Sequence, residues 1–216
     1  MKNSFYNADG KNIILKMVRG IQQNKDFLGE VDGLIGDGDH GMNMNKGFSV
    51  FEQRFGEDTF SFSEGLGNLS MILMNEIGGS MGPIYGTILM SMGDAIDDSE
   101  KEEIELGDFS AYFEAGLEGL YDIVDARVGD KTLVDTLAPA VSSLQKDAAE
   151  QASFADALKH MKEAALAGRN STKDLIAKYG RSSRLGERSR GVLDAGSCSC
   201  YIILEAMADG ILDLLQ

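Results

Sequence analysis

Three aspartates that lie within eight residues form the part of this sequence best suited to chemistry. They occur in the stretch VDGLIGDGDHG as Asp32, Asp37 and Asp39, with glycines between them. Glycine lets a backbone turn through conformations that other residues resist, so this stretch can fold its carboxylates onto one point. Two unit charges 4 Å apart repel by about 4 kcal/mol at an effective dielectric of about 20, so convergent carboxylates need a cation. Oxygen ligands suit a hard ion such as Mg²⁺ or Ca²⁺. The alternative is a solvated turn whose aspartates point outward and cap helices.

Two other motifs that match this stretch can be excluded. Residues 36–41 read G-x-G-x-x-G, but no predicted strand precedes them. Their acidic variable positions would also repel a pyrophosphate that lacks an intervening cation. An EF-hand loop that begins at Asp37 would have Phe48 at position twelve, where the motif requires Glu. The Walker A pattern does not occur in the sequence. The stretch is therefore neither a dinucleotide fingerprint nor a calcium loop.

Three further glycine-rich turns carry polar residues. Residues 78–83 read GGSMGP and lead into a predicted helix, whose first N–H groups can cradle a phosphate. Residues 129–132 read GDKT, with Asp135 one helical turn later. Residues 180–191 hold the one concentration of positive charge, namely Arg181, Arg184, Arg188 and Arg190. Each turn alone is most simply a helix connection. Together they supply carboxylates for cations, N–H groups for phosphates and arginines for residual charge, which favours a metal–nucleotide site.

Helices must position these turns, because apolar residues recur at spacings of three and four through most of the chain. The predicted helices lie near residues 13–21, 48–55, 64–73, 84–96, 109–124, 133–144, 153–165 and 201–214. Asp9 and Ser153 are placed to cap two of them, and Pro83 fits the first turn of a third. Residues 97–103 are expected to be a solvated loop. No segment alternates with a period of two, so no sheet is predicted. Short connections favour antiparallel neighbours around one core in a single all-α domain.

Charge and composition exclude several classes of partner. The formal net charge of −15 argues against nucleic acids and anionic membranes, which both need a basic surface. No run is expected to reach the apolar length of a membrane span, and the first residues lack the apolar segment of a signal peptide. Cys198 and Cys200 lie too close together for a relaxed disulfide and are expected to be buried, reduced thiols. These features predict a cytoplasmic protein.

The four turns together resemble the nucleotide-binding L subunit of bacterial dihydroxyacetone kinases, the Dak2-type domain. The matching motifs occur in the family's order across essentially the whole chain, residues 1–216. They read VDGLIGDGDHGMNMNKGF, GGSMGPIYGT, GDKTLVDTLAPA and GRSSRLGERSRGVLDAG. The resemblance implies a single domain built as an antiparallel eight-helix barrel. ADP or ATP would bind at one end of this barrel through two Mg²⁺ ions.

The resemblance also implies roles for individual residues. Asp32, Asp37 and Asp39 would be the metal ligands. The implied nucleotide-binding residues are His40, Gly41, Met42, Asn43, Gly79, Ser80, Met81, Gly129, Thr132, Arg181, Asp194 and Gly196. No catalytic residue is implied beyond the metal–nucleotide centre, because His40 would act as a donor to the ligand; a helix-capping histidine is the alternative. The chain departs from the family at Met81, where many members have a hydroxyl side chain, and at Ala195, where the family has proline.

The chemistry that the resemblance implies is a phosphoryl relay. A phosphohistidine carrier, the M subunit of the phosphotransferase system, would phosphorylate the bound ADP. The resulting ATP would pass its γ-phosphoryl group to dihydroxyacetone, or to a similar short ketose, on a separate K subunit. The chain would then be one subunit of a phosphoenolpyruvate-dependent kinase, and a homodimer is one expected assembly. The main alternative is a regulatory module whose nucleotide state controls a transcription factor or another enzyme. A structural helical protein with an acidic turn is the simplest alternative.

Overall fold

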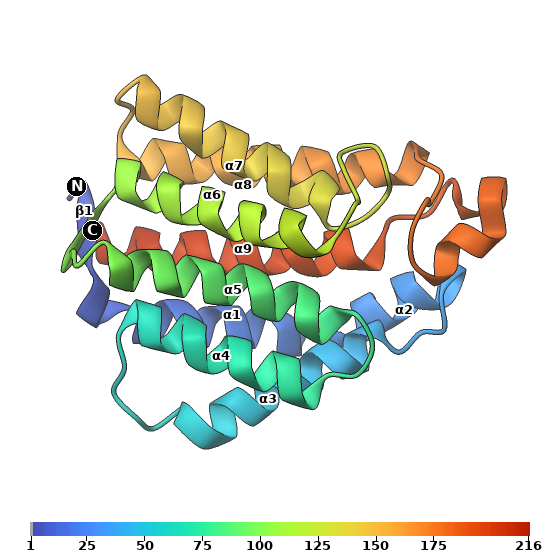
Figure 1. Cartoon of the computed structure of the whole chain (residues 1–216), viewed down its shortest axis with the longest axis horizontal. Coiled ribbons are helices and arrows are strands. Elements are labelled where there is room, and N and C mark those ends of the chain that lie inside the picture. The colour runs from blue at the N-terminus through green and yellow to red at the C-terminus, as the bar shows by residue number, and fades with distance from the viewer. Residues whose placement is uncertain (1) are drawn as a thin grey trace.

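Eight long helices form a closed ring in the computed structural model, which describes residues 2–216 (Figure 1). The ring follows the chain through α1 (Lys11–Gln23), α3 (His40–Phe55), α4 (Phe62–Glu76), α5 (Met81–Asp98), α6 (Leu106–Ile123), α7 (Val134–Ala149), α8 (Phe154–Ser171) and α9 (Ala195–Leu214). It closes where α9 packs against α1. Consecutive ring helices run antiparallel, and both chain termini lie at one end (Figure 1). The predicted all-α class and the antiparallel eight-helix barrel are confirmed.

The barrel has a filled interior, because each ring helix turns an apolar face inward. Near the termini, the Phe5 ring packs edge-on against Phe62 and Phe109, with centroid distances of 5.8 and 6.5 Å. Such aromatic pairs stabilise a core beyond the area that they bury. Cys198 and Cys200 on α9 are buried and unpaired, as predicted, and burial raises the pKa of the Cys198 thiol to about 11. Helix α9 thus forms much of the core.

Helix α9 also corrects one expectation about membranes. Within the described residues it is the one helix that is long and apolar enough to cross a bilayer, so the expectation that no run reaches this length is wrong. However, 72% of its apolar window is buried inside the protein. A core helix of a globular fold passes the same test of length and composition, because it is apolar on every side. The burial of α9 identifies it as such a helix.

Short polar signals set the starts of several helices. The Ser153 hydroxyl accepts the Asp156 N–H at 3.1 Å, which confirms the predicted cap of α8. Pro83 lies in the first turn of α5, as predicted, where its missing N–H costs nothing. Asp9 does not cap α1, because it belongs to a short 3-10 helix (Asn7–Asp9), and the N-cap of α1 is Gly10. Pro139 lies inside α7.

A small sheet and one helix end differ from the prediction. Strand β1 (Ser4–Tyr6) pairs antiparallel with β2 (Glu103–Glu105), and Phe5 lies opposite Ile104. Three residues are too few to show a period of two, so the pattern could not reveal these strands. The segment 97–103 is only partly a loop, because its first two residues complete α5 and its last begins β2. The burial of Phe5 and Ile104 holds this pair against the barrel.

A ninth helix, α2 (Lys25–Ile35), was missed by the sequence analysis. Its buried residues, Leu28, Val31 and Ile35, follow a helical spacing of three and four. Glycines within the same segment weaken helix propensity, so the segment reads as a turn. Asp32 consequently lies on a helix and not in the turn that follows it. Helix α2 sits at the end of the barrel opposite the termini (Figure 1).

Candidate functional site

All four glycine-rich turns lie at the barrel end that carries α2 (Figure 1). They surround a cavity of about 750 Å³, large enough for a nucleotide. Its walls come from the α2–α3 turn, the α4–α5 turn, the α6–α7 loop and the loop between α8 and α9. Twelve of the residues singled out from the sequence line it: Asp32, Asp37, Asp39, His40, Asn43, Gly79, Ser80, Met81, Thr132, Arg181, Asp194 and Gly196. The fold therefore brings together residues up to 164 positions apart in the chain (196 − 32).

Three of the fifteen implied metal- and nucleotide-binding residues do not line the cavity. Gly41 packs between helices, because a Cβ added there would lie 2.0 Å from the carbonyl oxygen of Lys25 in α2. Met42 points outward and is 61% exposed. Gly129 donates its N–H to Asp135 Oδ1 at 2.6 Å and so shapes the α6–α7 loop. Direct contacts of these three residues with a nucleotide remain predictions.

The three aspartates converge on one point at the α2–α3 turn. Asp32 lies in the last turn of α2, Asp37 in the connection and Asp39 at the N-cap of α3. One oxygen from each lies within 4.8 Å of the others. In an octahedral Mg²⁺ site with bonds of about 2.1 Å, ligand oxygens lie roughly 3 to 4 Å apart. The three carboxylates are thus close enough to share a divalent cation, and their role as metal ligands remains a prediction.

The backbone of this turn is shaped around the Asp32 carboxylate. Gly38 has φ +76°, a left-handed conformation that glycine adopts without steric penalty. A Cβ at Gly36 would lie 2.3 Å from Asp32 Oδ1, so only glycine lets the chain pass this close. The His40 N–H donates to Asp32 Oδ2 at 3.3 Å, and Arg181 forms an ion pair with Asp37. Positive charge from another loop therefore already faces the aspartates.

Four helices begin at this end of the barrel, which makes it attractive to anions. The first residues of α3, α5, α7 and α9, namely His40, Met81, Val134 and Ala195, all line the cavity. Helix N-termini carry partial positive charge and unpaired N–H groups. The α5 terminus is open, because its N-cap residue Ser80 makes no side-chain capping bond. Gly79, with φ +73°, turns the chain into it. This geometry suits phosphate oxygens.

The α6–α7 loop is tied to the loop before α9 by a lysine that the sequence analysis did not single out. Lys131 is 1% exposed, and its ammonium donates to the carbonyl oxygens of Thr172 and Val192. Burial lowers the pKa of Lys131. Asp194 caps α9 by accepting the Ser197 N–H at 2.7 Å, and burial raises its pKa to about 7. The two loops therefore form one supported wall of the cavity.

Two residues to which the sequence analysis gave no role hold His40 from behind. Its Nε2 lies 2.8 Å from the Ser199 hydroxyl, which in turn lies 2.6 Å from the Tyr85 hydroxyl. Burial lowers the pKa of His40 to about 4, although the Asp32 carboxylate opposes this shift. His40 is therefore neutral near pH 7. The sequence offered a weak signal for Tyr85, which follows the second glycine turn, and none for Ser199.

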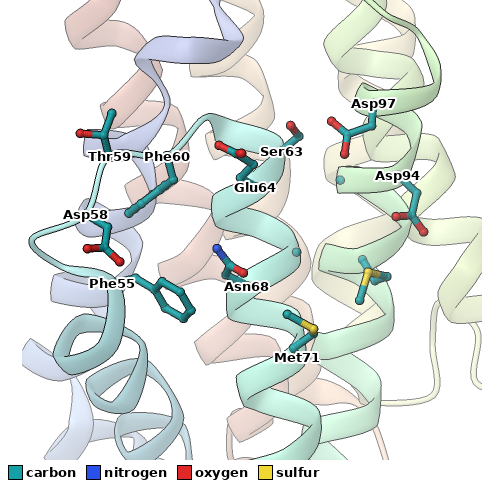
Figure 2. Close-up of a pocket in the computed structure, with 13 residues that line it drawn as sticks. Phe55, Asp58, Thr59, Phe60, Ser63, Glu64, Asn68, Met71, Asp94 and Asp97 are labelled. Atoms are coloured by element: carbon teal, nitrogen blue, oxygen red, sulfur yellow. The ribbon is translucent and has the colours of Figure 1, made fainter.

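A second concave region lies on the side of the barrel, between α4, α5 and the α3–α4 loop (Figure 2). This cleft has a volume of about 420 Å³. Its four acidic residues, Asp58, Glu64, Asp94 and Asp97, lie apart along its two walls (Figure 2). Within residues 2–216, no basic side chain lines it, and no metal-competent group of carboxylates occurs there. It lacks the converging donors of the end cavity.

Comparison with known proteins shows that the chain is similar to subunits of dihydroxyacetone kinases. Residues 34–209 match the family model of the DAK2 domain. The chain is 37% identical over 188 residues to the ADP-binding subunit of PEP-dependent dihydroxyacetone kinase 1 of Listeria innocua serovar 6a, covering 87% of this chain and 88% of that one. It is also 37% identical over 190 residues to the ADP-binding subunit of the PTS-dependent dihydroxyacetone kinase of Lactococcus lactis subsp. lactis, with coverages of 88% and 90%.

Solved structures share the fold. The native dihydroxyacetone kinase of C. freundii superposes with a TM-score of 0.72 at 20% identity, over 94% of this chain and 34% of that one. The same kinase in complex with AMP-PNP and Mg²⁺ gives a TM-score of 0.68 at 17% identity. This chain therefore spans about a third of the length of that kinase.

Proposed function

This chain belongs to the DAK2 domain family, and we propose that it is the ADP- or ATP-binding subunit of a multi-subunit dihydroxyacetone kinase of the phosphoenolpyruvate-dependent type. Residues 1–216 would act as one nucleotide-binding domain in the cytoplasm. The two relatives described above, which match this chain over nearly their whole lengths, are named as ADP-binding subunits of such kinases. These names and coverages support the role of a nucleotide-binding subunit.

One observation carries the proposal: three convergent carboxylates share a cavity with the N-termini of four helices. Carboxylates alone would repel a nucleotide, and helix N-termini alone would bind any anion. The combination suits a ligand that brings both cations and phosphates. It explains how a protein of net charge −15 can bind an anionic coenzyme.

Each part of the cavity has a role in this proposal. Asp32, Asp37 and Asp39 would hold two Mg²⁺ ions, which neutralise phosphate charge and orient the phosphate oxygens when bound. The N–H groups of the first turn of α5 and the Ser80 hydroxyl would bind phosphate oxygens. Arg181, now paired with Asp37, would turn to the remaining negative charge. Met81 supplies no hydroxyl, so its N–H group would serve in place of its side chain. The chain needs no general base of its own, because positioning and charge neutralisation dominate phosphoryl transfer.

One proposed partner would donate a phosphoryl group to the nucleotide at this site, and the other would supply the acceptor. A phosphohistidine carrier, the M subunit, would give up its phosphoryl group to the nucleotide held here: the N–P bond breaks and a P–O bond forms. Dihydroxyacetone, or a similar short ketose on the K subunit, would then receive the same group. A homodimer of this chain is part of the proposed assembly, and neither nucleic acid nor membrane takes part in it.

Reconstitution with purified K and M subunits tests the proposal. The chain should co-purify with a nucleotide by native mass spectrometry, bind it more tightly with Mg²⁺, and carry phosphoryl groups to dihydroxyacetone only when both partners are present. Retained nucleotide without phosphoryl flow would overturn the kinase role and leave the regulatory module. Failure to bind any nucleotide in the presence of Mg²⁺ would overturn both.

A further inference from the structure

Three side chains at the wall of the end cavity form a series of hydrogen bonds that ends at a main-chain carbonyl oxygen. His40 comes from α3, Ser199 from α9 and Tyr85 from α5. His40 Nε2 lies 2.8 Å from Ser199 Oγ, and Ser199 Oγ lies 2.6 Å from the Tyr85 hydroxyl. The Tyr85 hydroxyl donates to the carbonyl oxygen of Gly196 at 2.9 Å. The exposed fractions of His40, Tyr85 and Ser199 are 7%, 4% and 0%.

The number of available protons decides which group donates in each of these hydrogen bonds. The Gly196 carbonyl can only accept, so the single phenolic proton of Tyr85 points to it. The Tyr85 oxygen then accepts the proton of Ser199, and Ser199 Oγ accepts from His40. All three of these contacts carry a proton only if His40 is protonated on Nε2. If Nε2 were bare, Ser199 would donate to it, and Tyr85 could donate to only one of its two partners. Either Ser199 Oγ at 2.6 Å or the Gly196 carbonyl oxygen at 2.9 Å would then face the Tyr85 oxygen without a proton.

The other ring nitrogen of His40 faces the cavity. Nδ1 has no hydrogen-bond partner within the described residues, and in that part of the chain no fully buried side-chain nitrogen or oxygen lacks one. Nδ1 therefore reaches open space. Since His40 lines the end cavity, this space is the proposed nucleotide cavity.

We propose that Ser199 and Tyr85 are positioning residues that hold the His40 imidazole in its Nε2–H tautomer and present a bare Nδ1 to the cavity. The statement about the tautomer stands alone, whereas the identity of what enters the cavity rests on the proposed function. A bare nitrogen cannot contact an ionised phosphate oxygen directly, because both carry lone pairs. It can accept from a water molecule that bridges the imidazole and the phosphate. His40 is then an acceptor, which revises the expectation that it donates to the ligand.

The second histidine of the chain provides an internal control with the opposite tautomer. His160 Nδ1 lies 2.9 Å from Asp147 Oδ2, and an ionised carboxylate only accepts. His160 must therefore carry a proton on Nδ1. The sequence contains only these two histidines. One spectrum of the full chain with ¹⁵N-labelled histidine can thus report both arrangements.

The experiment measures the ring-nitrogen shifts at about pH 8, above the ordinary histidine pKa of about 6.5. We expect a protonated Nε2 and a bare Nδ1 for His40, and a protonated Nδ1 for His160. The variant Asp147→Asn should change the signals of His160 alone and so assign the spectrum. A protonated Nδ1 on His40 in the parent would overturn the proposal.

Two variants test which residues set the tautomer. Ser199→Ala removes the acceptor for Nε2–H, so the His40 signals should move toward a mixture of tautomers. Tyr85→Phe should have a smaller effect, because Ser199 Oγ also lies 3.2 and 3.1 Å from the carbonyl oxygens of Ala195 and Gly196 and can donate to them. Unchanged His160 signals would show that each variant is folded. A pure Nε2–H tautomer in folded Ser199→Ala would overturn the role of Ser199.

Addition of Mg²⁺ and ADP separates this proposal from the proposed function. In the parent, His40 should keep its tautomer while its Nδ1 signal shifts. Ser199→Ala should weaken ADP binding about fivefold, the equivalent of one neutral hydrogen bond. A proton gained by Nδ1 when ADP binds would overturn the acceptor role. If His40 has the expected tautomer but does not respond to Mg²⁺ and ADP, the positioning role of Ser199 and Tyr85 would be supported and the proposed function would be contradicted.

Discussion

The helix N-termini at the two ends of the barrel differ in their side-chain caps. At the end with the termini, Ser61 and Ser153 cap α4 and α8 by accepting the N–H groups of Glu64 and Asp156 at 3.2 and 3.1 Å. At the cavity end, the N-cap residues of α3 and α5 are also capping types, aspartate and serine, yet neither makes a side-chain cap. A residue that could satisfy its own helix, but does not, is available to a ligand. The same residue types thus stabilise one end and equip the other for binding.

Acidity alone does not make a site, as the end cavity and the side cleft show. The cleft holds four acidic side chains that spread along its walls (Figure 2). The end cavity also holds four, but three of them meet within 4.8 Å and face helix N-termini and Arg181. Spread carboxylates remain hydrated, whereas convergent ones need a cation. Convergence therefore distinguishes the candidate site.

The largest expected effect on binding is the loss of nucleotide from Asp37→Asn. This change removes one charged ligand from the aspartate cluster, so Mg²⁺-dependent ADP retention should fall by more than tenfold, the equivalent of about 1.4 kcal/mol. Helicity by circular dichroism should not change, because Asp37 is exposed in a turn. Isothermal titration with ADP and Mg²⁺ measures the effect. Asp94→Asn in the side cleft is the matched control and should bind like the parent; equal losses in the two variants would contradict the comparison.

The difference between the two ends also explains what the sequence could predict. The four turns were found because glycines and charged residues stand together locally, and the ring helices because their apolar spacing is regular. Helix α2 was hidden by its own glycines, and the β1–β2 pair by its length. Ser199 and Lys131 act through partners 159 and up to 61 positions away, so nothing local marks them. Residue types can reveal a cluster, but only the fold shows which groups support it.

A second effect, on stability, concerns Asp194, the one N-cap at the cavity end that does cap its helix. Burial raises its pKa from 3.8 to about 7, so the folded protein binds this proton more tightly than the unfolded chain does. Between about pH 4 and pH 7 the unfolded chain releases the proton while the folded protein keeps it, and the stability contributed by this group falls as pH rises. Asp194→Asn keeps a capping side chain without the charge.

The variant should therefore gain stability relative to the parent as pH rises from 5 to 8, by about 2 to 3 kcal/mol. Urea denaturation of both proteins at the two pH values measures this relative change. Taking the difference cancels the titration of the many other acidic groups. A variant whose stability follows the parent at both pH values would show that the Asp194 carboxyl is not held protonated at the cavity end.

The smallest expected effects come from two serines that occupy the same position at opposite ends. Ser153→Ala removes a formed cap and should lower the free energy of unfolding by about 1 kcal/mol, with ADP binding unchanged. Ser80→Ala removes no cap, so stability should change by only a few tenths of a kcal/mol, within the range of ordinary surface changes. However, Ser80→Ala should weaken ADP binding by up to about fivefold, because the hydroxyl is a candidate phosphate ligand. Urea denaturation and ADP titration of both variants complete the test. If Ser80→Ala destabilised the fold as much as Ser153→Ala and bound ADP normally, both serines would serve to stabilise their helices. The proposed role of Ser80 in phosphate binding would then be contradicted.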